Sequence, residues 1–270
     1  IYRPETNTWV QAMLPFPHVI YNRIPTRKDE QTPEVQRIIQ ACLKHSRISL
    51  FNPCFFSKWF LFEALNKSKA TRKYVPATKK LTSMSDLEGM LARFPLVYLK
   101  PIRGKAGVGI MRIERPKTKK GSYILKVQVL KRSKVFAYPT IKQVWNAVSK
   151  LTASEDYLVQ QGIPLAVTEG RPFDLRVLVQ KNHRGEWSLT GIGARVAGRY
   201  SITTHVPRGG RIDDPQKALT SAFGAETAKA TLKRIQQTAL LIARQIEKAS
   251  GYKLGEMSMD LGVDTTGQIW

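Results

Sequence analysis

The sequence predicts an α+β fold whose sheets are made from antiparallel hairpins. Leu96–Lys100 and Gly109–Ile113 have strand character and are joined by a glycine-rich turn, which indicates a hairpin and not a strand-to-helix phosphate loop. Arg171–Gln180 alternates apolar and polar residues, and Trp187–Val196 follows it across a short turn, as in a second hairpin. Apolar residues with helical spacing then run through Glu226–Ala249, which predicts a long helix packed on one face.

The elements before the first hairpin divide into two groups. Residues 1–54 are rich in proline and aromatic residues and resemble the last part of a domain that begins earlier. The expected elements up to the second hairpin are, in chain order, a helix at Val35–Lys44, a strand at Ile48–Phe51, helices at Ser57–Asn66 (N-cap Ser57) and Ser85–Arg93, a strand at Tyr123–Val129, a helix at Thr140–Leu151 and a strand at Tyr157–Gln160.

Two further segments complete the expected architecture. Ser201–Arg211 is a basic loop that contains glycine, and Glu256–Val263 is a strand. After a turn at Asp264–Gly267, the residues Gln268–Trp270 are expected to begin the partner strand of Glu256–Val263.

The charge of the chain points to anionic ligands. Lys and Arg number 44 and Asp and Glu number 20, which gives a formal charge of +24. The segment from Lys100 to Lys150 contains fourteen basic residues and one acidic residue, Glu114. This excess predicts contact with nucleic acid, a phosphate-rich ligand, an acidic polymer or an anionic membrane. No apolar run approaches the roughly 18 residues that span a bilayer, and no secretory signal is visible.

Cysteine and histidine spacing excludes two classes of site. Cys42 and Cys54 are too few for a disulfide scaffold, and we expect two reduced thiols. The histidines show no metal-ligand spacing, so a zinc site is not expected. They are His18, His45, His183 and His205.

The glycine-rich turn is the first candidate site. On a strand, Tyr98 and Lys100 share a face, so Lys100 projects beside the turn that holds Gly104, Gly107 and Gly109. Backbone N–H groups in such turns bind phosphate oxygens, and a lysine supplies a mobile positive charge. An ordinary glycine-rich hairpin with a solvated lysine is the alternative.

Two strand faces offer further candidates. Asp174 and Arg176 lie two residues apart on one face and could contact substrate or phosphates; the alternative is a cross-strand ion pair. Ser258 and Asp260 share a face with Glu256, and strand-end carboxylates beside phosphate-binding groups are typical Mg²⁺ ligands. A solvent-facing acid is the alternative there.

Taken together, these motifs resemble the ATP-grasp superfamily, and within it the YheC/YheD-type, spore-coat-associated proteins of endospore-forming bacteria. The resemblance covers about residues 51–270. It rests on the segments 51–59, 97–110, 157–163, 171–176, 191–197 and 255–270. It implies two α/β lobes with antiparallel sheets that grip ATP between them, preceded by a partial N-terminal domain.

The domain boundaries follow from the resemblance. Residues 1–54 would be the remnant of the preceding domain, 55–163 the N-terminal lobe with the lid and glycine-rich loop, and 164–270 the C-terminal lobe. In related ligases a Glu and an Asn on the next strand complete the metal site, so this sequence would end before that point.

The resemblance also implies roles for individual residues. Lys58 and Lys100 would hold the ATP phosphates, and the three glycines of the turn would close over them. Arg176 or Arg195 would steady the transferred phosphate, because Ser258 stands where D-alanine–D-alanine ligases carry an arginine. The remaining implied cofactor contacts are Gln160, Gln161 and Ile163 around adenine, Asp174 nearby, and Asp260 as a Mg²⁺ ligand.

The function implied is an ATP- and Mg²⁺-dependent carboxylate–amine ligase that works through an acyl-phosphate. Its partners would be ATP and an anionic small-molecule, peptide or polymer substrate, met by Arg195 and the basic loop Thr203–Arg211. The protein would be cytoplasmic or associated with the spore coat. The rival hypotheses are a basic module that binds an acidic polymer or nucleic acid without ligase activity, and phosphotransfer to an acceptor that is not a carboxylate.

Overall fold

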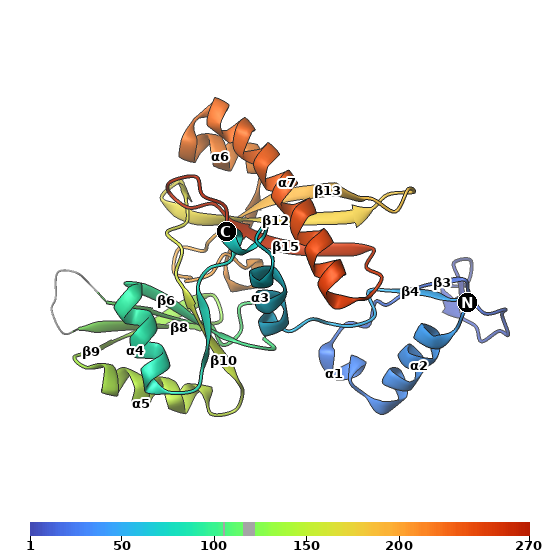
Figure 1. Cartoon of the computed structure of the whole chain (residues 1–270), viewed down its shortest axis with the longest axis horizontal. Helices are drawn as coiled ribbons and strands as arrows, with labels where there is room; N and C mark the ends of the chain where they lie inside the picture. The colour runs from blue at the N-terminus through green and yellow to red at the C-terminus, as the bar shows by residue number, and fades with distance from the viewer. Residues whose placement is uncertain (105, 116–121) are drawn as a thin grey trace. The chain divides into compact units, whose positions relative to one another are not determined.

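The structure, a computed structural model, describes residues 1–104, 106–115 and 122–270 (Figure 1). The chain forms two compact units: unit 1 is Ile1–Phe55 with Tyr252–Gly255, and unit 2 is Phe56–Gly251 with Glu256–Trp270. Four lysines of the basic run lie outside the described residues, namely Lys105, Lys117, Lys119 and Lys120.

Unit 1 contains two small sheets and two helices. The expected helix begins two residues earlier than predicted, at Pro33, because proline at the first helical position lacks only an N–H that would be unpaired anyway. Its core is formed by Ile39, Cys42 and Leu50. The elements are β1 (Tyr2–Arg3), β2 (Thr8–Trp9), β3 (Val19–Tyr21), β4 (Ser49–Phe51), α1 (Arg27–Glu30) and α2 (Pro33–Lys44), with β3 and β4 parallel.

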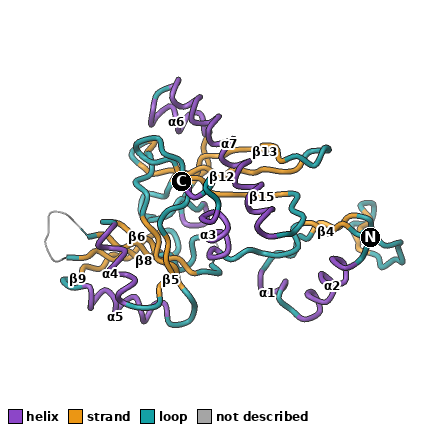
Figure 2. The backbone as a smooth tube through the Cα atoms, in the orientation of Figure 1, coloured by secondary structure: helices purple, strands orange, loops and turns teal. Residues whose placement is uncertain are grey.

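Unit 2 begins with α3 (Lys58–Lys67) and a six-stranded antiparallel sheet (Figure 2). The order of its strands is β5-β10-β6-β7-β8-β9. The strands are β5 (Thr78–Leu81), β6 (Leu96–Pro101), β7 (Met111–Glu114), β8 (Tyr123–Val129), β9 (Arg132–Tyr138) and β10 (Tyr157–Gln161). A 3₁₀ turn, η1 (Arg72–Tyr74), precedes the sheet. Two helices pack against the sheet: α4 (Met84–Arg93) and α5 (Ile141–Thr152).

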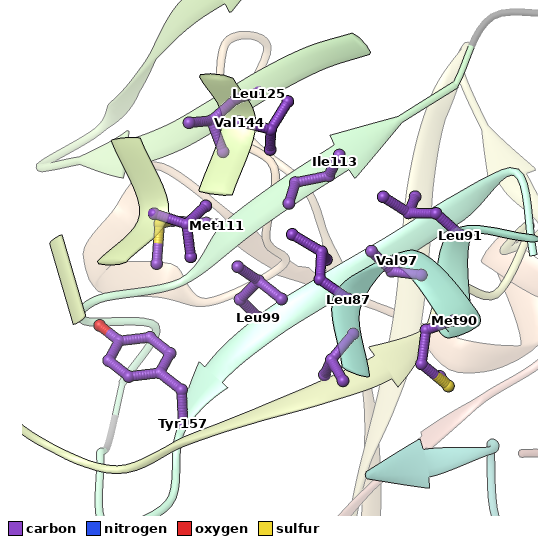
Figure 3. Close-up of a cluster of buried hydrophobic side chains, with 12 residues drawn as sticks. Leu87, Met90, Leu91, Val97, Leu99, Met111, Ile113, Leu125, Val144 and Tyr157 are labelled. Atoms are coloured by element: carbon purple, nitrogen blue, oxygen red, sulfur yellow. The ribbon is translucent and has the colours of Figure 1, made fainter. Parts of the chain in front are cut away.

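One face of the six-stranded sheet is apolar and packs on α4 and α5. Val97 and Leu99 of β6 point into this core and are fully buried (Figure 3). Leu87 of α4 and Val144 of α5 are also fully buried there. Because side chains alternate along a strand, Tyr98 and Lys100 lie on the opposite face of β6.

A second sheet of five antiparallel strands follows. β12 lies at its centre, between β13 and β15. β11 pairs with the start of β12, and β14 pairs with the end of β13. The strands are β11 (Val167–Thr168), β12 (Arg171–Lys181), β13 (Trp187–Val196), β14 (Arg211–Asp213) and β15 (Glu256–Gly262). The helices are η2 (Val206–Arg208), α6 (Pro215–Phe223) and α7 (Ala225–Ser250).

The five-stranded sheet also has one apolar face. Phe173 and Val177 of β12 are fully buried, and α7 packs over this side of the sheet with Ile235 and Ala239 fully buried. The long helix is therefore confirmed, and it ends at Gly251, whose φ of +68° suits glycine. The other face of β12 is left with its polar side chains.

Some elements differ from the sequence expectation. β5, β9 and α6 were not predicted; β5 and β9 carry several lysines or arginines and have weak apolar alternation. The strand expected at Gly109 starts at Met111, because Gly109 belongs to the turn with φ +70°. Gln268–Trp270 does not form a continuous strand, but its expected antiparallel pairing is present: Ile269 bridges Val263, and Trp270 exchanges both backbone hydrogen bonds with Gly262.

Asp86 is expected to contribute strongly to stability. It is buried, completes the capping box of α4 with Ser83, and accepts further hydrogen bonds from Thr82. Asp86→Ala should lower the free energy of unfolding by about 1–3 kcal/mol, measured by urea denaturation. The matched change at exposed Glu88 on the same helix should stay within about 0.5 kcal/mol; equal losses would contradict this.

Candidate functional site

The turn between β6 and β7 depends on its glycines for packing. A Cβ on Gly109 would lie 2.8 Å from Pro101 Cγ and 2.8 Å from the Tyr157 hydroxyl. A Cβ on Gly104 would lie 2.9 Å from Pro101 Cβ, and Gly107 has a φ of +72°. All three glycines therefore meet a steric or backbone requirement.

Lys58 contacts the start of this turn, and Lys100 lies on β6 just before it. Lys58, in the first turn of α3 after the N-cap Ser57, donates to the carbonyl oxygens of Pro101 (2.7 Å) and Gly104 (2.6 Å). Lys58 therefore ties α3 to the start of the turn. Lys100 projects from the polar face of β6 and donates to Gln160 Oε1 at 2.6 Å.

The Lys100 ammonium is partly buried, and the negative charges of Asp260 and Asp174 act on it. Burial lowers its pKa, and the charges of Asp260 and Asp174 oppose that shift. These two carboxylates belong to the five-stranded sheet, so the polar faces of the two sheets meet around Lys100. A cation desolvated in this way interacts strongly with an added anion.

An arginine on β13 joins the two carboxylates. Arg195 donates Nε and Nη2 to Asp174 at 2.8 and 2.6 Å, and Nη2 also lies 2.9 Å from Asp260. Its side chain is only 5% exposed. Burial alone lowers the pKa of Arg195, but the bonds and charges of the two aspartates outweigh burial and raise it. Arg195 is therefore a fixed cation.

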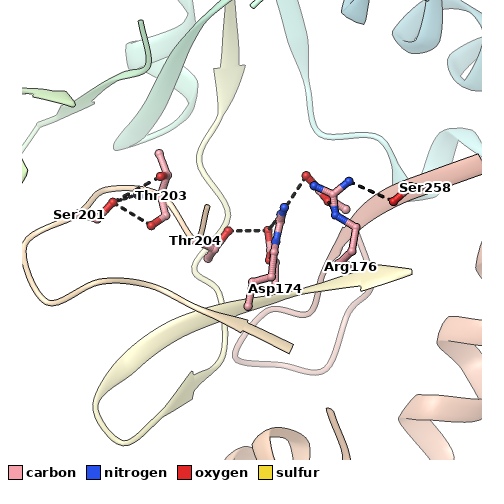
Figure 4. Close-up of polar contacts among 8 residues, drawn as sticks. Asp174, Arg176, Ser201, Thr203, Thr204 and Ser258 are labelled. Atoms are coloured by element: carbon pink, nitrogen blue, oxygen red, sulfur yellow. Dashed lines mark hydrogen bonds and ion pairs between the residues drawn. The ribbon is translucent and has the colours of Figure 1, made fainter. Parts of the chain in front are cut away.

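Arg176 lies on the neighbouring strand and is more open. Its Nε lies 2.9 Å from Asp260 Oδ1 and its Nη1 donates to Ser258 at 3.1 Å (Figure 4). Its side chain is 43% exposed. The sequence left ligand contact and cross-strand ion pairing open for Asp174 and Arg176; both form cross-strand pairs, Asp174 with Arg195 and Arg176 with Asp260.

The loop that follows β13 closes over this cluster. Thr204 donates its hydroxyl to Asp174 Oδ2 at 2.8 Å. The loop is anchored on the six-stranded sheet as well, because Gln128 accepts from the Ile202 N–H at 2.9 Å and Tyr98 donates to the Ile202 carbonyl at 3.2 Å. Ser201 bonds locally to Thr203.

His205 was missed by the sequence analysis, which tested histidines only for metal spacing. Among the described side chains, its Nδ1 is one of three buried polar atoms without a hydrogen-bond partner. Burial and the charge of Arg195 lower the pKa of His205. Its position beside the Gly107 turn, 3.3 Å from a Cβ placed there, could be found only from the structure.

The residues implied to surround adenine lie together at the end of β10. Gln160 accepts from Lys100 and donates to Thr78, and Gln161 accepts from the Ala77 N–H. Ile163 lies two residues after Gln161 in the sequence. Their contact with a base stays a prediction.

The described residues fit phosphates better than they fit a metal alone. The partly buried Lys100 ammonium lies on β6 just before the glycine turn, and the open Arg176 guanidinium lines the same cleft as Ala106 of that turn. No three described His, Cys, Asp or Glu side chains cluster as a metal cage. Asp260, 37% exposed, accepts from two arginines; Mg²⁺ would need phosphate oxygens beside this one carboxylate, and part of the arginine pairing would have to be given up.

A sequence model described as YheC/D like ATP-grasp matches residues 47–270. The chain belongs to the YheC/D-like ATP-grasp family. This confirms the resemblance inferred from the motifs, and the two antiparallel sheets with their helices confirm the expected fold class.

Curated relatives and solved structures agree with this assignment. The chain is 28% identical over 265 residues to the endospore coat-associated protein YheD of Bacillus subtilis (strain 168), covering 98% of this chain and 57% of YheD. It is 23% identical over 209 residues to YheC of the same organism, covering 77% and 56%. The chain thus spans a little over half the length of the curated relatives it matches.

Two solved structures share the fold. D-cycloserine synthetase DcsG matches with a TM-score of 0.53 and 15% identity, over 93% of this chain and 73% of its own. The ATP-grasp ligase PsnB complexed with minimal precursor matches with a TM-score of 0.51 and 12% identity, over 94% and 68%. None of the described helices is long and apolar enough to cross a membrane.

The two arginines should differ in their effect on stability. Arg195→Met leaves the mostly buried Asp174 carboxylate, whose side chain is 15% exposed, without its charged partner, and should cost about 3–5 kcal/mol of unfolding free energy. Arg176→Met removes a half-exposed pair and should cost less than about 1 kcal/mol. Urea denaturation of both variants tests this, and similar losses would contradict the distinction.

His205 should make stability depend on pH. Because its pKa is lowered in the folded chain, the unfolded chain binds more protons between that pKa and the ordinary value of about 6.5. The free energy of unfolding therefore rises with pH through this window. Denaturation between pH 5 and 7 should show a smaller slope for His205→Gln and an unchanged slope for the exposed control His183→Gln.

Proposed function

We propose that this chain is the core of an ATP-dependent carboxylate–amine ligase that acts on an anionic substrate through an acyl-phosphate. The observation that carries the proposal is the position of Lys100 beside the glycine turn and opposite the cluster of Asp174, Asp260, Arg176 and Arg195. Family membership supports it, since neighbours with this fold include a protein named as a ligase.

The charges of the site suit a nucleoside triphosphate. The two aspartates and two arginines of the cluster cancel, so Lys100 adds one positive charge that they do not balance. ATP, when bound, would supply the γ-phosphoryl group. Lys100 and the backbone of the glycine turn would hold phosphate oxygens, and Arg176 would face the reacting groups. Fixed charges of this kind stabilise developing negative charge without reorganising.

The proposed reaction has two steps: phosphoryl transfer to the carboxylate, and acyl transfer to the amine. A substrate carboxylate oxygen bonds to the γ-phosphorus while the bond to the leaving ADP breaks. An amine nitrogen then bonds to the acyl carbon, the carbon–oxygen bond to phosphate breaks, and the amine loses a proton. The chain contributes mainly by positioning these groups. Asp260 is our candidate Mg²⁺ ligand, and no step above depends on it.

The biological setting is inferred from the relatives. YheD and YheC are named as endospore coat-associated, so we propose that the product or the protein belongs to the spore coat or envelope, with the reaction in the cytoplasm. We also propose the three-part domain division at residues 1–54, 55–163 and 164–270.

A second function is favoured by one surface observation. Exposed Arg132 and Arg199 lie 5.7 and 5.6 Å from the Tyr200 ring, and Lys131 and Lys134 are exposed beside them. Such a group could bind an acidic polymer or a nucleic acid. Binding of this kind would weaken steeply with salt and consume no ATP.

Lys100→Met should reduce ADP release at least about 100-fold, because the positive charge that the proposal places on the phosphates is lost. The assay uses the full-length protein with amino acids, peptides and acidic polymers as acceptors, with mass detection of the product. Lys142→Met, on the exposed side of α5, is the control and should keep normal turnover.

Two results would overturn the assignment. Normal ADP release by a folded Lys100→Met variant would remove Lys100 from the reaction. A phosphoester product in place of an amide would replace ligation with phosphotransfer to another acceptor.

A further inference from the structure

A cleft of about 630 Å³ opens on the polar face of the five-stranded sheet, next to the glycine turn. Ala106 of the turn lines it, so the cleft adjoins the place proposed for the phosphates. Its other sides come from β12, β13, β14 and the loop with η2. The residues that line it include Arg176, Leu178, Gly191, Gly193, Val206 and Ile212.

The cleft exists because two residues of β13 lack side chains. Gly193 pairs with Arg176 and Gly191 pairs with Leu178 across β12 and β13, so these four share one face. A Cβ on Gly191 would meet nothing within 4 Å, and a Cβ on Gly193 would touch Ile212 Cγ2 at 3.3 Å. Gly191 therefore borders empty space that a larger side chain would fill.

Arginine side chains line the polar part of the cleft, and the aspartates that pair with them do not line it. Arg195 is nearly completely buried and committed to the aspartates, whereas Arg176 keeps 43% of its side chain exposed. No acidic side chain lines the cleft, among the residues the structure describes. A carboxylate would therefore be attracted to the exposed part of the Arg176 guanidinium, with which it can form a charge-assisted hydrogen bond, and an ammonium group would be repelled.

The rest of the lining is mostly apolar and open. Ile212 pairs beside Arg195 on this face of the sheet and is 69% exposed, and Val206 is also exposed. Leu178 forms the wall on the other strand. Covering these side chains with an apolar group would remove their surface from water, which is favourable by roughly 25 cal/mol per Å².

We propose that this cleft binds a small carboxylic acid with a branched apolar side chain. The carboxylate pairs with Arg176, and the side chain lies over Gly191 and Gly193, between Leu178 on β12 and Ile212 on β14. The inference rests on the proposed function, because it names the acid that the ligase would activate. It selects one class among the anionic substrates that the charge of the chain allows.

The test measures binding separately from turnover. Isothermal titration calorimetry of the full-length protein is carried out with 4-methylpentanoate, acetate and 4-methylpentanamide. We expect 4-methylpentanoate to bind at least about tenfold more tightly than acetate, because its larger apolar side chain leaves water on binding. It should also bind at least about tenfold more tightly than the uncharged amide.

A glycine pair provides matched variants. Gly191→Leu fills the cleft and should lower the affinity for 4-methylpentanoate at least about tenfold while the affinity for ATP is unchanged. Gly89→Leu is the control: Gly89 is exposed on α4 and a Cβ there also meets nothing within 4 Å. Its affinities should equal those of the unaltered protein, and thermal melts confirm that both variants fold.

The outcomes separate this inference from the proposed function. Binding of 4-methylpentanoate that Gly191→Leu abolishes, without ADP release, would support the cleft and refute the ligase. ADP release with other acids, while 4-methylpentanoate binds no better than acetate or is unaffected by Gly191→Leu, would support the ligase and overturn the inference.

Discussion

The polar centre of unit 2 depends on one buried guanidinium group. Arg195 bridges Asp174 on β12 and Asp260 on β15, so it holds together side chains from three adjacent strands. A buried carboxylate without such a partner is strongly unfavourable, and this requirement fixes which residues can face the site. Arg195 binds Oδ2 of Asp260 and Arg176 binds Oδ1 of the same carboxylate, while the Arg176 side chain stays partly exposed.

Strand alternation explains why the functional groups gather between two sheets. Each sheet has only one apolar face, and helices cover it: α4 and α5 on the six-stranded sheet, α6 and α7 on the other. The polar faces are thereby left for Lys100 on one sheet and for the arginines and aspartates on the other. The hydrophobic effect builds the two layers, and electrostatics then determines what the uncovered faces can bind.

The sequence was informative where local patterns are strong and limited where contacts are distant. The alternation of β12 and the spacing of α7 predicted both elements and their buried faces. The pairing of Arg195 with Asp174 links residues 21 positions apart, and no local pattern specifies it. The empty space beside Gly191 and the buried Nδ1 of His205 depend on elements far apart in the chain. For the same reason Lys58 could be expected near phosphates, but not its bonds to the turn.

The loop that carries His205 has a mechanical consequence for the cleft. In sequence it belongs to the five-stranded sheet, yet Gln128 and Tyr98 of the six-stranded sheet hold Ile202 at its start. Arg208 adds a bond to the carbonyl of Ala106 in the glycine turn. Any change in the angle between the sheets must therefore break these bonds or pull the loop along. The width of the cleft and the position of the glycine turn depend on the same few hydrogen bonds, so one motion would adjust both.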